Sequence, residues 1–248
     1  MINKAKSSIL LYLCYFITGV MLVPMIASCS KEGTTLSTSN AYLNIVNVSP
    51  DVRPFNLYAN AIRQGLTTYN YPSASNYFLQ NVAEVPLEIR PVLASNVTQT
   101  RLLVLDQELK RDVRYTWYVT GFRSDSSLAT VFTVDSSSAP AVGRGKIRFV
   151  NVSINSPALN LTANDTIAFR NVPYKSVTDY IELTAGNYNL NITASATPST
   201  SIKALSSVSI LDGKLYTVYA YGLVGRVTTD TAAFNAGVTL NTIPNIKK

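Results

Sequence analysis

The sequence predicts an all-β protein with two tandem antiparallel β-sandwich domains of immunoglobulin-like size. The composition favours sheet, because Thr, Val, Ile and Tyr are abundant and these residue types are enriched in strands. Several short motifs occur twice along the chain at a nearly constant spacing, which indicates an internal repeat. With 248 residues, of which 47% are hydrophobic, the chain is long enough to fill two cores.

The first 28 residues have the organisation of a secretory signal peptide. Lys4 and Lys6 precede an apolar run over residues 9–26, and the run ends in the sequence IASC, which places Cys29 directly after two small residues. This ending resembles the lipobox of bacterial lipoproteins, in which the Cys is acylated and becomes the first residue after cleavage. A transmembrane anchor is the alternative, since about 20 apolar residues can span a bilayer. The polar segment SKEGTTLSTSN that follows favours cleavage and a lipid on Cys29.

Cleavage would leave the mature domains without a thiol or a disulfide, because Cys14 would depart with the signal peptide and Cys29 would carry the lipid. The chain contains no His, which excludes Ser-His-Asp catalysis and His-ligated zinc. Its 21 Lys and Arg residues, against 14 Asp and Glu, are scattered along the chain, so we expect no nucleic-acid partner. We also expect no cofactor and no metal, although Asp51, Asp165 or Asp212 at turns could supply oxygen ligands to calcium; none of them begins a calcium-loop motif, and turn formation explains them equally well.

Two blocks of sequence recur at an offset of 104 residues. NIVNVSP at 44–50 is similar to RFVNVSI at 148–154, and FNLYAN at 55–60 is similar to LNLTAN at 159–164. A later block, RYTWYVTG, recurs as LYTVYAYG at an offset of 101. Such small changes of offset are what insertions and deletions in loops produce.

The repeat defines the expected domain organisation. After the signal peptide (1–28) and a lipidated tether (29–40), we expect the first sandwich at 41–135 and the second at 146–248. The segment SSSAPAVGRG at 136–145 has the Ser, Pro and Gly content of a linker.

Within each domain the apolar period is two, as strands with one buried face require. Leu87 and Ile89 alternate with charged residues in PLEIRPV, and Leu190 and Ile192 alternate with polar residues in NLNITAS. Turn sequences such as SPDVRP, TAGNY and LDGK separate the apolar runs, so that about seven strands fit each domain. The Asn-Ser pair that both copies of the opening motif share predicts a turn after the first strand.

These motifs together carry a family resemblance. The Val-Asn-x-Ser opening, the Gly-Asn-Tyr turn before an alternating strand and the late Tyr-Thr-x-Tyr strand ending in Gly resemble a domain of unknown function (DUF4397-type) of tandem lipoproteins in the Bacteroidota envelope. The opening motif ends in Pro50-Asp51 in the first copy but in Ile154-Asn155 in the second. The resemblance implies an envelope location and brings no known activity.

Exposed tyrosines are the candidate ligand-binding residues, because sugar rings stack on aromatic side chains. Trp117 aligns with Val218 in the repeat and is therefore expected in the core, whereas the opposite face of the same strand is expected at the surface. The candidates are Tyr69, Tyr71, Tyr77, Tyr118, Tyr219 and Tyr221.

We therefore expect a non-enzymatic, lipid-anchored envelope protein that binds a glycan or another polymer at the cell surface. A structural or adhesive module that contacts other envelope proteins is the alternative. A carboxylate-based hydrolase is the third hypothesis, but it needs two carboxyl groups facing a cleft, and the sequence singles out no pair. Ser30 follows the Cys in place of the Asp that favours inner-membrane retention in proteobacteria, so we expect the outer membrane; Lys31-Glu32 resembles a surface-export signal.

Overall fold

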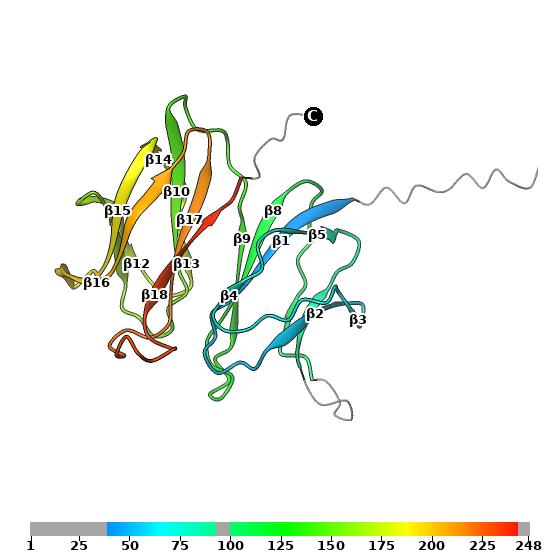
Figure 1. Cartoon of the computed structure of the whole chain (residues 1–248). Helices are drawn as coiled ribbons and strands as arrows, with labels where there is room; N and C mark the ends of the chain where they lie inside the picture. Colours follow the sequence, from blue (N-terminus) through cyan, green and yellow to red (C-terminus); the bar gives the residue numbers. More distant parts are fainter. Residues whose placement is uncertain (1–38, 93–99, 243–248) are drawn as a thin grey trace, which may run out of the picture. The chain divides into compact units, whose positions relative to one another are not determined.

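Strands make up all the regular secondary structure in residues 39–92 and 100–242, the part of the chain that the computed structural model describes (Figure 1). The predicted all-β sandwich fold is thereby confirmed. The strands fall into two series with the same order of pairing, one before and one after the segment at 136–143. The first strand of the second series already begins at Arg144, within the segment expected to be the linker.

The first repeat is a sandwich of two sheets. One sheet has the order β4-β1-β8-β9, with β5 also paired to β1, and the other has the order β3-β2-β6-β7. All neighbouring strands are antiparallel except β1 and β8, which run parallel. This pair departs from the purely antiparallel prediction and arises because the chain crosses between the sheets before β8 returns beside β1. The strands are β1 (Asn40–Asn47), β2 (Phe55–Ala59), β3 (Ile62–Arg63), β4 (Ser73–Ala74), β5 (Phe78–Asn81), β6 (Leu87–Pro91), β7 (Leu103–Leu105), β8 (Arg114–Thr120) and β9 (Ala129–Val134).

The second repeat has the same topology. Its sheets have the orders β13-β10-β17-β18, with β14 also paired to β10, and β12-β11-β15-β16. Here β10 and β17 form the parallel pair. The strands are β10 (Arg144–Asn151), β11 (Leu159–Ala163), β12 (Thr166–Val172), β13 (Ser176–Val177), β14 (Ile181–Thr184), β15 (Gly186–Ala194), β16 (Thr197–Ile210), β17 (Leu215–Tyr221) and β18 (Asn235–Leu240).

Each sandwich encloses an apolar core of its own. Trp117 is fully buried in the first core, as the alignment with Val218 predicted, and Val218 is fully buried in the second. The Trp117 Nε1–H donates a hydrogen bond to Thr130 Oγ1 at 3.1 Å, so the indole loses no hydrogen bond on burial.

The shared Asn-Ser pair closes the turn after the opening strand, as predicted. Asn47 Oδ1 accepts a hydrogen bond from the backbone N–H of Ser49 at 3.2 Å, and Ser49 Oγ donates to the carbonyl of Gly121 at 2.6 Å. The second bond ties this turn to the end of β8. Gly121 has a φ of +87°, and a Cβ at this position would lie 2.2 Å from the carbonyl oxygen of Ser127. The equivalent residues of the second repeat are Asn151, Ser153 and Gly222.

Candidate functional site

A third apolar cluster contains residues of both repeats. At its centre the rings of Tyr118 and Tyr219 lie 5.6 Å apart, and these two residues occupy equivalent positions of the repeat. Because the same surface of each repeat contributes to the contact, the contact is isologous, as in a two-fold symmetric dimer. The remaining members are Val46, Val48, Val131, Val150 and Val152.

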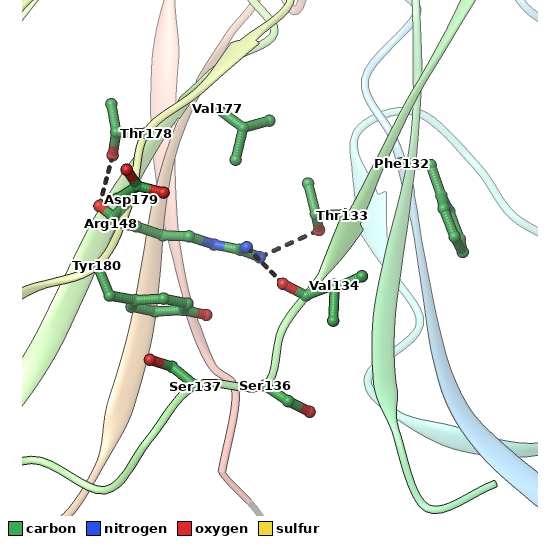
Figure 2. A pocket seen from close by; sticks show the side chains of 10 residues that line it. All are labelled: Phe132, Thr133, Val134, Ser136, Ser137, Arg148, Val177, Thr178, Asp179 and Tyr180. Atoms are coloured by element: carbon green, nitrogen blue, oxygen red, sulfur yellow. Dashed lines mark hydrogen bonds between the residues drawn. The ribbon is translucent and has the colours of Figure 1, made fainter. Parts of the chain in front are cut away.

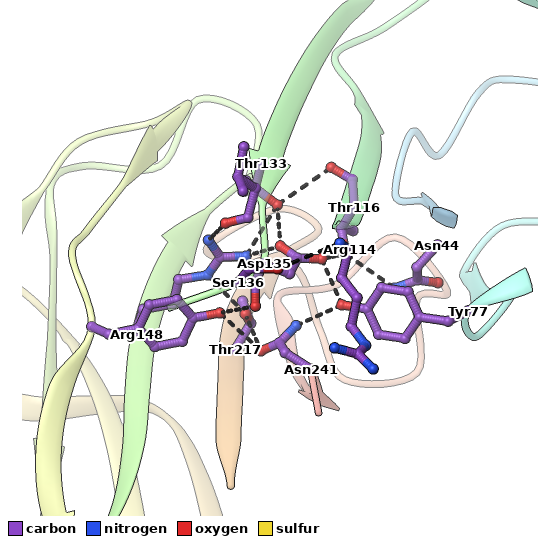
Figure 3. A network of polar contacts seen from close by, with 12 residues as sticks. Asn44, Tyr77, Arg114, Thr116, Thr133, Asp135, Ser136, Arg148, Thr217 and Asn241 are labelled. Carbon is purple, nitrogen blue, oxygen red and sulfur yellow. Dashed lines mark hydrogen bonds and ion pairs between the residues drawn. The ribbon is translucent and has the colours of Figure 1, made fainter. Parts of the chain in front are cut away.

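Beside this cluster, Asp135 is the centre of a buried polar network (Figure 3). Its carboxylate accepts hydrogen bonds from Tyr77 OH at 2.5 Å, from Thr116 Oγ1 at 2.5 Å and from Thr133 Oγ1 at 2.7 Å. It also accepts a hydrogen bond from the guanidinium of Arg148, with which it forms an ion pair. Asp135 follows the last strand of the first repeat, whereas Arg148 lies on the first strand of the second.

The Arg148 side chain is only 4% exposed, and that of Asp135 is fully buried. Arg148 Nε donates to Thr217 Oγ1 at 2.8 Å, one terminal nitrogen donates to the carbonyl of Val134 at 2.8 Å, and the guanidinium lies 4.8 Å from the ring centre of Tyr180. Burial by itself would lower the pKa of Arg148, but Asp135 and nearby tyrosines raise it above its ordinary value. The Arg148 guanidinium therefore stays protonated, and its ion pair with Asp135 joins the repeats.

The second repeat has an uncharged residue, Asn241, at the position equivalent to Asp135, and its tyrosine, Tyr180, donates to this asparagine. Strand register equates Asp135 with Asn241, because Thr116 pairs with Thr133 just as Thr217 pairs with Thr239. Asn241 Oδ1 accepts hydrogen bonds from Thr217 Oγ1 at 2.7 Å and from Tyr180 OH at 3.2 Å.

The position equivalent to Arg148 in the first repeat is Asn44, at the offset of 104. Asn44 Nδ2 donates to Thr116 Oγ1 at 3.4 Å. The acid of the pair is thus found only in the first repeat and the base only in the second. The two copies have diverged in a complementary way at their contact.

Two open grooves flank this network, each with a volume of about 440 Å³. The first groove lies between the end of β9 and the segment around β13 (Figure 2). Its lining includes Thr133, Ser136, Arg148, Asp179 and Tyr180.

The second groove lies between the end of β18 and the segment around β4. Its lining combines two aromatic rings with hydroxyl and amide groups and with aliphatic side chains. The polar and aromatic members are Asn76, Tyr77, Tyr219, Thr239 and Thr242.

The structure brings five of the six candidate tyrosines to the contact between the repeats. Tyr77 and Tyr219 line the second groove. Tyr71 and Tyr221 are half-buried, and burial, followed by the proximity of Tyr221 and Asp230, raises the pKa of Tyr71 to about 12. The prediction of a surface position is wrong for Tyr118, which is fully buried, and for Tyr219, which is only 9% exposed, because each repeat covers the strand face of the other that was expected to meet solvent.

The same prediction is wrong for Tyr69, which is 3% exposed. Its ring packs in the first core, 5.4 Å from the ring of Phe55, and burial raises its pKa to about 12. Tyr69 also lines a smaller groove of about 250 Å³ beside β5.

Sequence reasoning missed Asp135, Asn241 and Arg148. Arg148 did offer a signal: it is a charged residue inside an apolar strand where the other copy has Asn44. Cys29, the predicted lipid attachment site, lies outside the described residues. Within residues 39–92 and 100–242, no group of three His, Cys, Asp or Glu side chains is placed to hold a metal ion, and no helix is long and apolar enough to cross a membrane.

A sandwich present twice, with a buried isologous contact between its copies, defines a tandem β-sandwich repeat protein. The family model described as Domain of unknown function (DUF4397) matches the chain at residues 41–162 and again at residues 154–239. These matches cover most of the chain, so the chain belongs to this family, as its motifs predicted. No curated protein matches the sequence.

Proposed function

We propose that the chain is a non-enzymatic, lipid-anchored protein of the bacterial envelope that binds a glycan or a similar polymer in the grooves between its repeats. The observation that carries this proposal is the second groove. It combines Tyr77 and Tyr219 with the side chains of Asn76, Thr239 and Thr242 in an open volume of about 440 Å³. Aromatic rings beside hydroxyl and amide groups match the alternating apolar faces and hydroxyl edges of a sugar chain.

The polar network supports the proposal because it holds the groove walls in place. Tyr77 lines the groove, and its hydroxyl donates to Asp135 and accepts from Asn241 Nδ2 at 2.8 Å. A ring fixed at its hydroxyl end offers a preformed surface, so that binding costs little conformational entropy.

Native gel electrophoresis through neutral polysaccharides tests the proposal. We expect slower migration of the chain in gels that contain an α-glucan, a β-glucan or a mannan. Ala74→Trp places a large ring in the second groove, because Ala74 lines it, and should reduce the retardation. Val142→Trp is the matched control, since Val142 is 97% exposed and lines neither groove. Unchanged migration of the unmodified chain in all three polymers would refute the proposal.

The lipid anchor has its own test. Cells fed a labelled palmitate analogue should label the chain, and Cys29→Ala should abolish the label. Fractionation of the same cells should place the protein in the outer membrane, and protease treatment of intact cells would report surface exposure. Label that persists on the Cys29→Ala chain contradicts the lipid anchor but does not bear on the proposed glycan binding in the grooves.

Contact with other envelope proteins is the second candidate function, and β16 is the observation that favours it. This strand has 14 residues, stands at the edge of its sheet and is largely exposed. Edge strands offer backbone donors and acceptors to another chain. Crosslinking in whole cells followed by purification should recover one specific envelope partner if this function holds, and Ala204→Pro within β16 should abolish that recovery.

A further inference from the structure

The two grooves are copies of one another. Ala74 pairs with Val46 between β4 and β1, and Val177 pairs with Val150 between β13 and β10. Since Val46 and Val150 are equivalent residues, Ala74 and Val177 are equivalent as well, and each lines one groove. The internal repeat therefore makes the β13 wall of the first groove equivalent to the β4 wall of the second.

The opposite walls are equivalent too. Thr133 lines the first groove from β9 and Thr239 lines the second from β18, and strand register equates these two residues. Each groove thus combines the last strand of one repeat with the β4 or β13 segment of the other. An isologous contact produces two such grooves by necessity, because any feature between the partners occurs twice.

The central network separates the grooves and connects their tyrosines. Tyr77 lines the second groove and Tyr180, its equivalent, lines the first. Both hydroxyls reach Asn241, Tyr77 as acceptor at 2.8 Å and Tyr180 as donor at 3.2 Å. Each groove therefore has one tyrosine whose hydroxyl is held from the same buried centre.

The charges limit the class of ligand that both grooves share. The second groove has no Asp, Glu, Lys or Arg in its lining. The first contains Arg148, but this guanidinium is only 4% exposed and is neutralised by Asp135, and the exposed ionisable side chain that remains is the acid Asp179. An anionic polymer would meet no available cation in either groove, whereas hydroxyl groups and a tyrosine are common to both.

We infer that the chain has two repeat-related binding sites for a neutral glycan, so that one molecule holds two glycan segments at once. This inference rests on the proposed function and adds the number of sites and the class of sugar. A protein that engages two segments joins separate polymer chains or binds one long chain with increased avidity.

Isothermal titration with neutral hexasaccharides (malto-, laminari- and mannohexaose) tests the inference. We expect a stoichiometry of two for the unmodified chain with the hexasaccharide that binds. Ala74→Trp and Val177→Trp are a matched pair that should each leave one site, and the double variant should leave none. The Val142→Trp control should keep both sites. Polygalacturonate hexamers should bind at least tenfold more weakly than the neutral ligand.

The possible results separate the inference from the proposed function. A stoichiometry of one, or the loss of all binding in one single variant, refutes the two-site inference but leaves a glycan-binding protein. No binding of any hexasaccharide, together with no gel retardation, refutes both. If a tryptophan variant fails to fold, Asn76→Gly and Asp179→Ala each remove a polar group from one groove without adding bulk, and each must weaken one of two sites.

Discussion

Replacement of the buried ion pair tests whether Asp135 and Arg148 hold the repeats together as a unit. Arg148→Asn leaves the Asp135 carboxylate buried with three hydroxyl donors but without its counter-charge. Asp135→Asn leaves the Arg148 guanidinium buried against Thr217 and the Val134 carbonyl. Removal of one partner of a buried pair typically costs about 3–5 kcal/mol, and we expect each single variant to lose about that much free energy of unfolding.

The double variant should recover most of this loss. It gives both repeats the same residues at both positions, since the equivalents of Arg148 and Asp135 are Asn44 and Asn241. An Asn at 148 has the hydroxyl of Thr217 nearby, just as Asn44 has that of Thr116. Replacement of a whole buried pair by neutral groups is often nearly neutral, so the coupling free energy in the cycle should be at least about 2 kcal/mol.

Urea unfolding of the four proteins, followed by tyrosine and tryptophan fluorescence, measures this coupling. The exposed pair Arg111–Asp112, with nitrogen and oxygen 3.2 Å apart, supplies a matched control cycle, for which surface pairs predict a coupling of about 1 kcal/mol or less. A coupling between positions 135 and 148 no larger than that of the control would refute the argument that the pair joins the repeats. A double variant as unstable as the worse single variant would refute it equally.

Three further predictions concern the turns that both repeats share and one acidic loop. Ser49→Ala and Ser153→Ala each remove a buried hydrogen bond to a glycine carbonyl, of 2.6 and 2.7 Å, and should each lower the free energy of unfolding by about 1–2 kcal/mol in urea titrations; unequal costs would contradict the equivalence of the two turns. Gly222→Ala should cost more than about 2 kcal/mol by the same measurement, because its φ is +77° and a Cβ would lie 2.3 Å from the Ala233 carbonyl oxygen. Burial would raise the pKa of Asp51, but backbone hydrogen bonds from Arg123 and Ser124 lower it below 3.8 overall, so its stabilising contribution is present above this pH and is lost as the pH falls through the folded-state value. The loss of stability in Asp51→Asn should therefore be clear at pH 7 and should shrink below about pH 4; a difference that is independent of pH would contradict the assignment.

The sequence predicted the sandwich and the position of Trp117 because period-two alternation and the internal repeat report directly on burial within one domain. Trp117 aligns with Val218, and both are fully buried. The same alternation placed Tyr118 on the opposite face of β8, which is correct, but it could not show what covers that face. Tyr118 is buried by the other repeat, and a pattern within one strand contains no information about contacts between domains.

The buried ion pair was harder to predict because alternation along one strand does not show that a charged residue is buried against another repeat. Asp135 lies just after a strand end, where an acid is usually solvated, and its equivalence with Asn241 becomes visible only from the pairing of β8 with β9 and of β17 with β18. The grooves combine segments that lie far apart in the sequence: Ala74 and Val238 are 164 residues apart, and Thr133 and Asp179 are 46 residues apart. Only the contact between the repeats brings these segments together.

The complementary divergence of the repeats determines which copies can pair. A contact between two first repeats would bury Asp135 opposite Asn44 on both sides, and a contact between two second repeats would bury Arg148 opposite Asn241. Either arrangement leaves two unpaired buried charges, each of which costs several kcal/mol. The pairing of a first repeat with a second satisfies both charges at once. A buried pair adds little net stability in comparison with neutral groups, but it penalises the alternative pairings, which is how specificity arises between surfaces that are otherwise alike. The same pairing builds both grooves, so the residues that select the partner also determine whether the candidate binding sites exist.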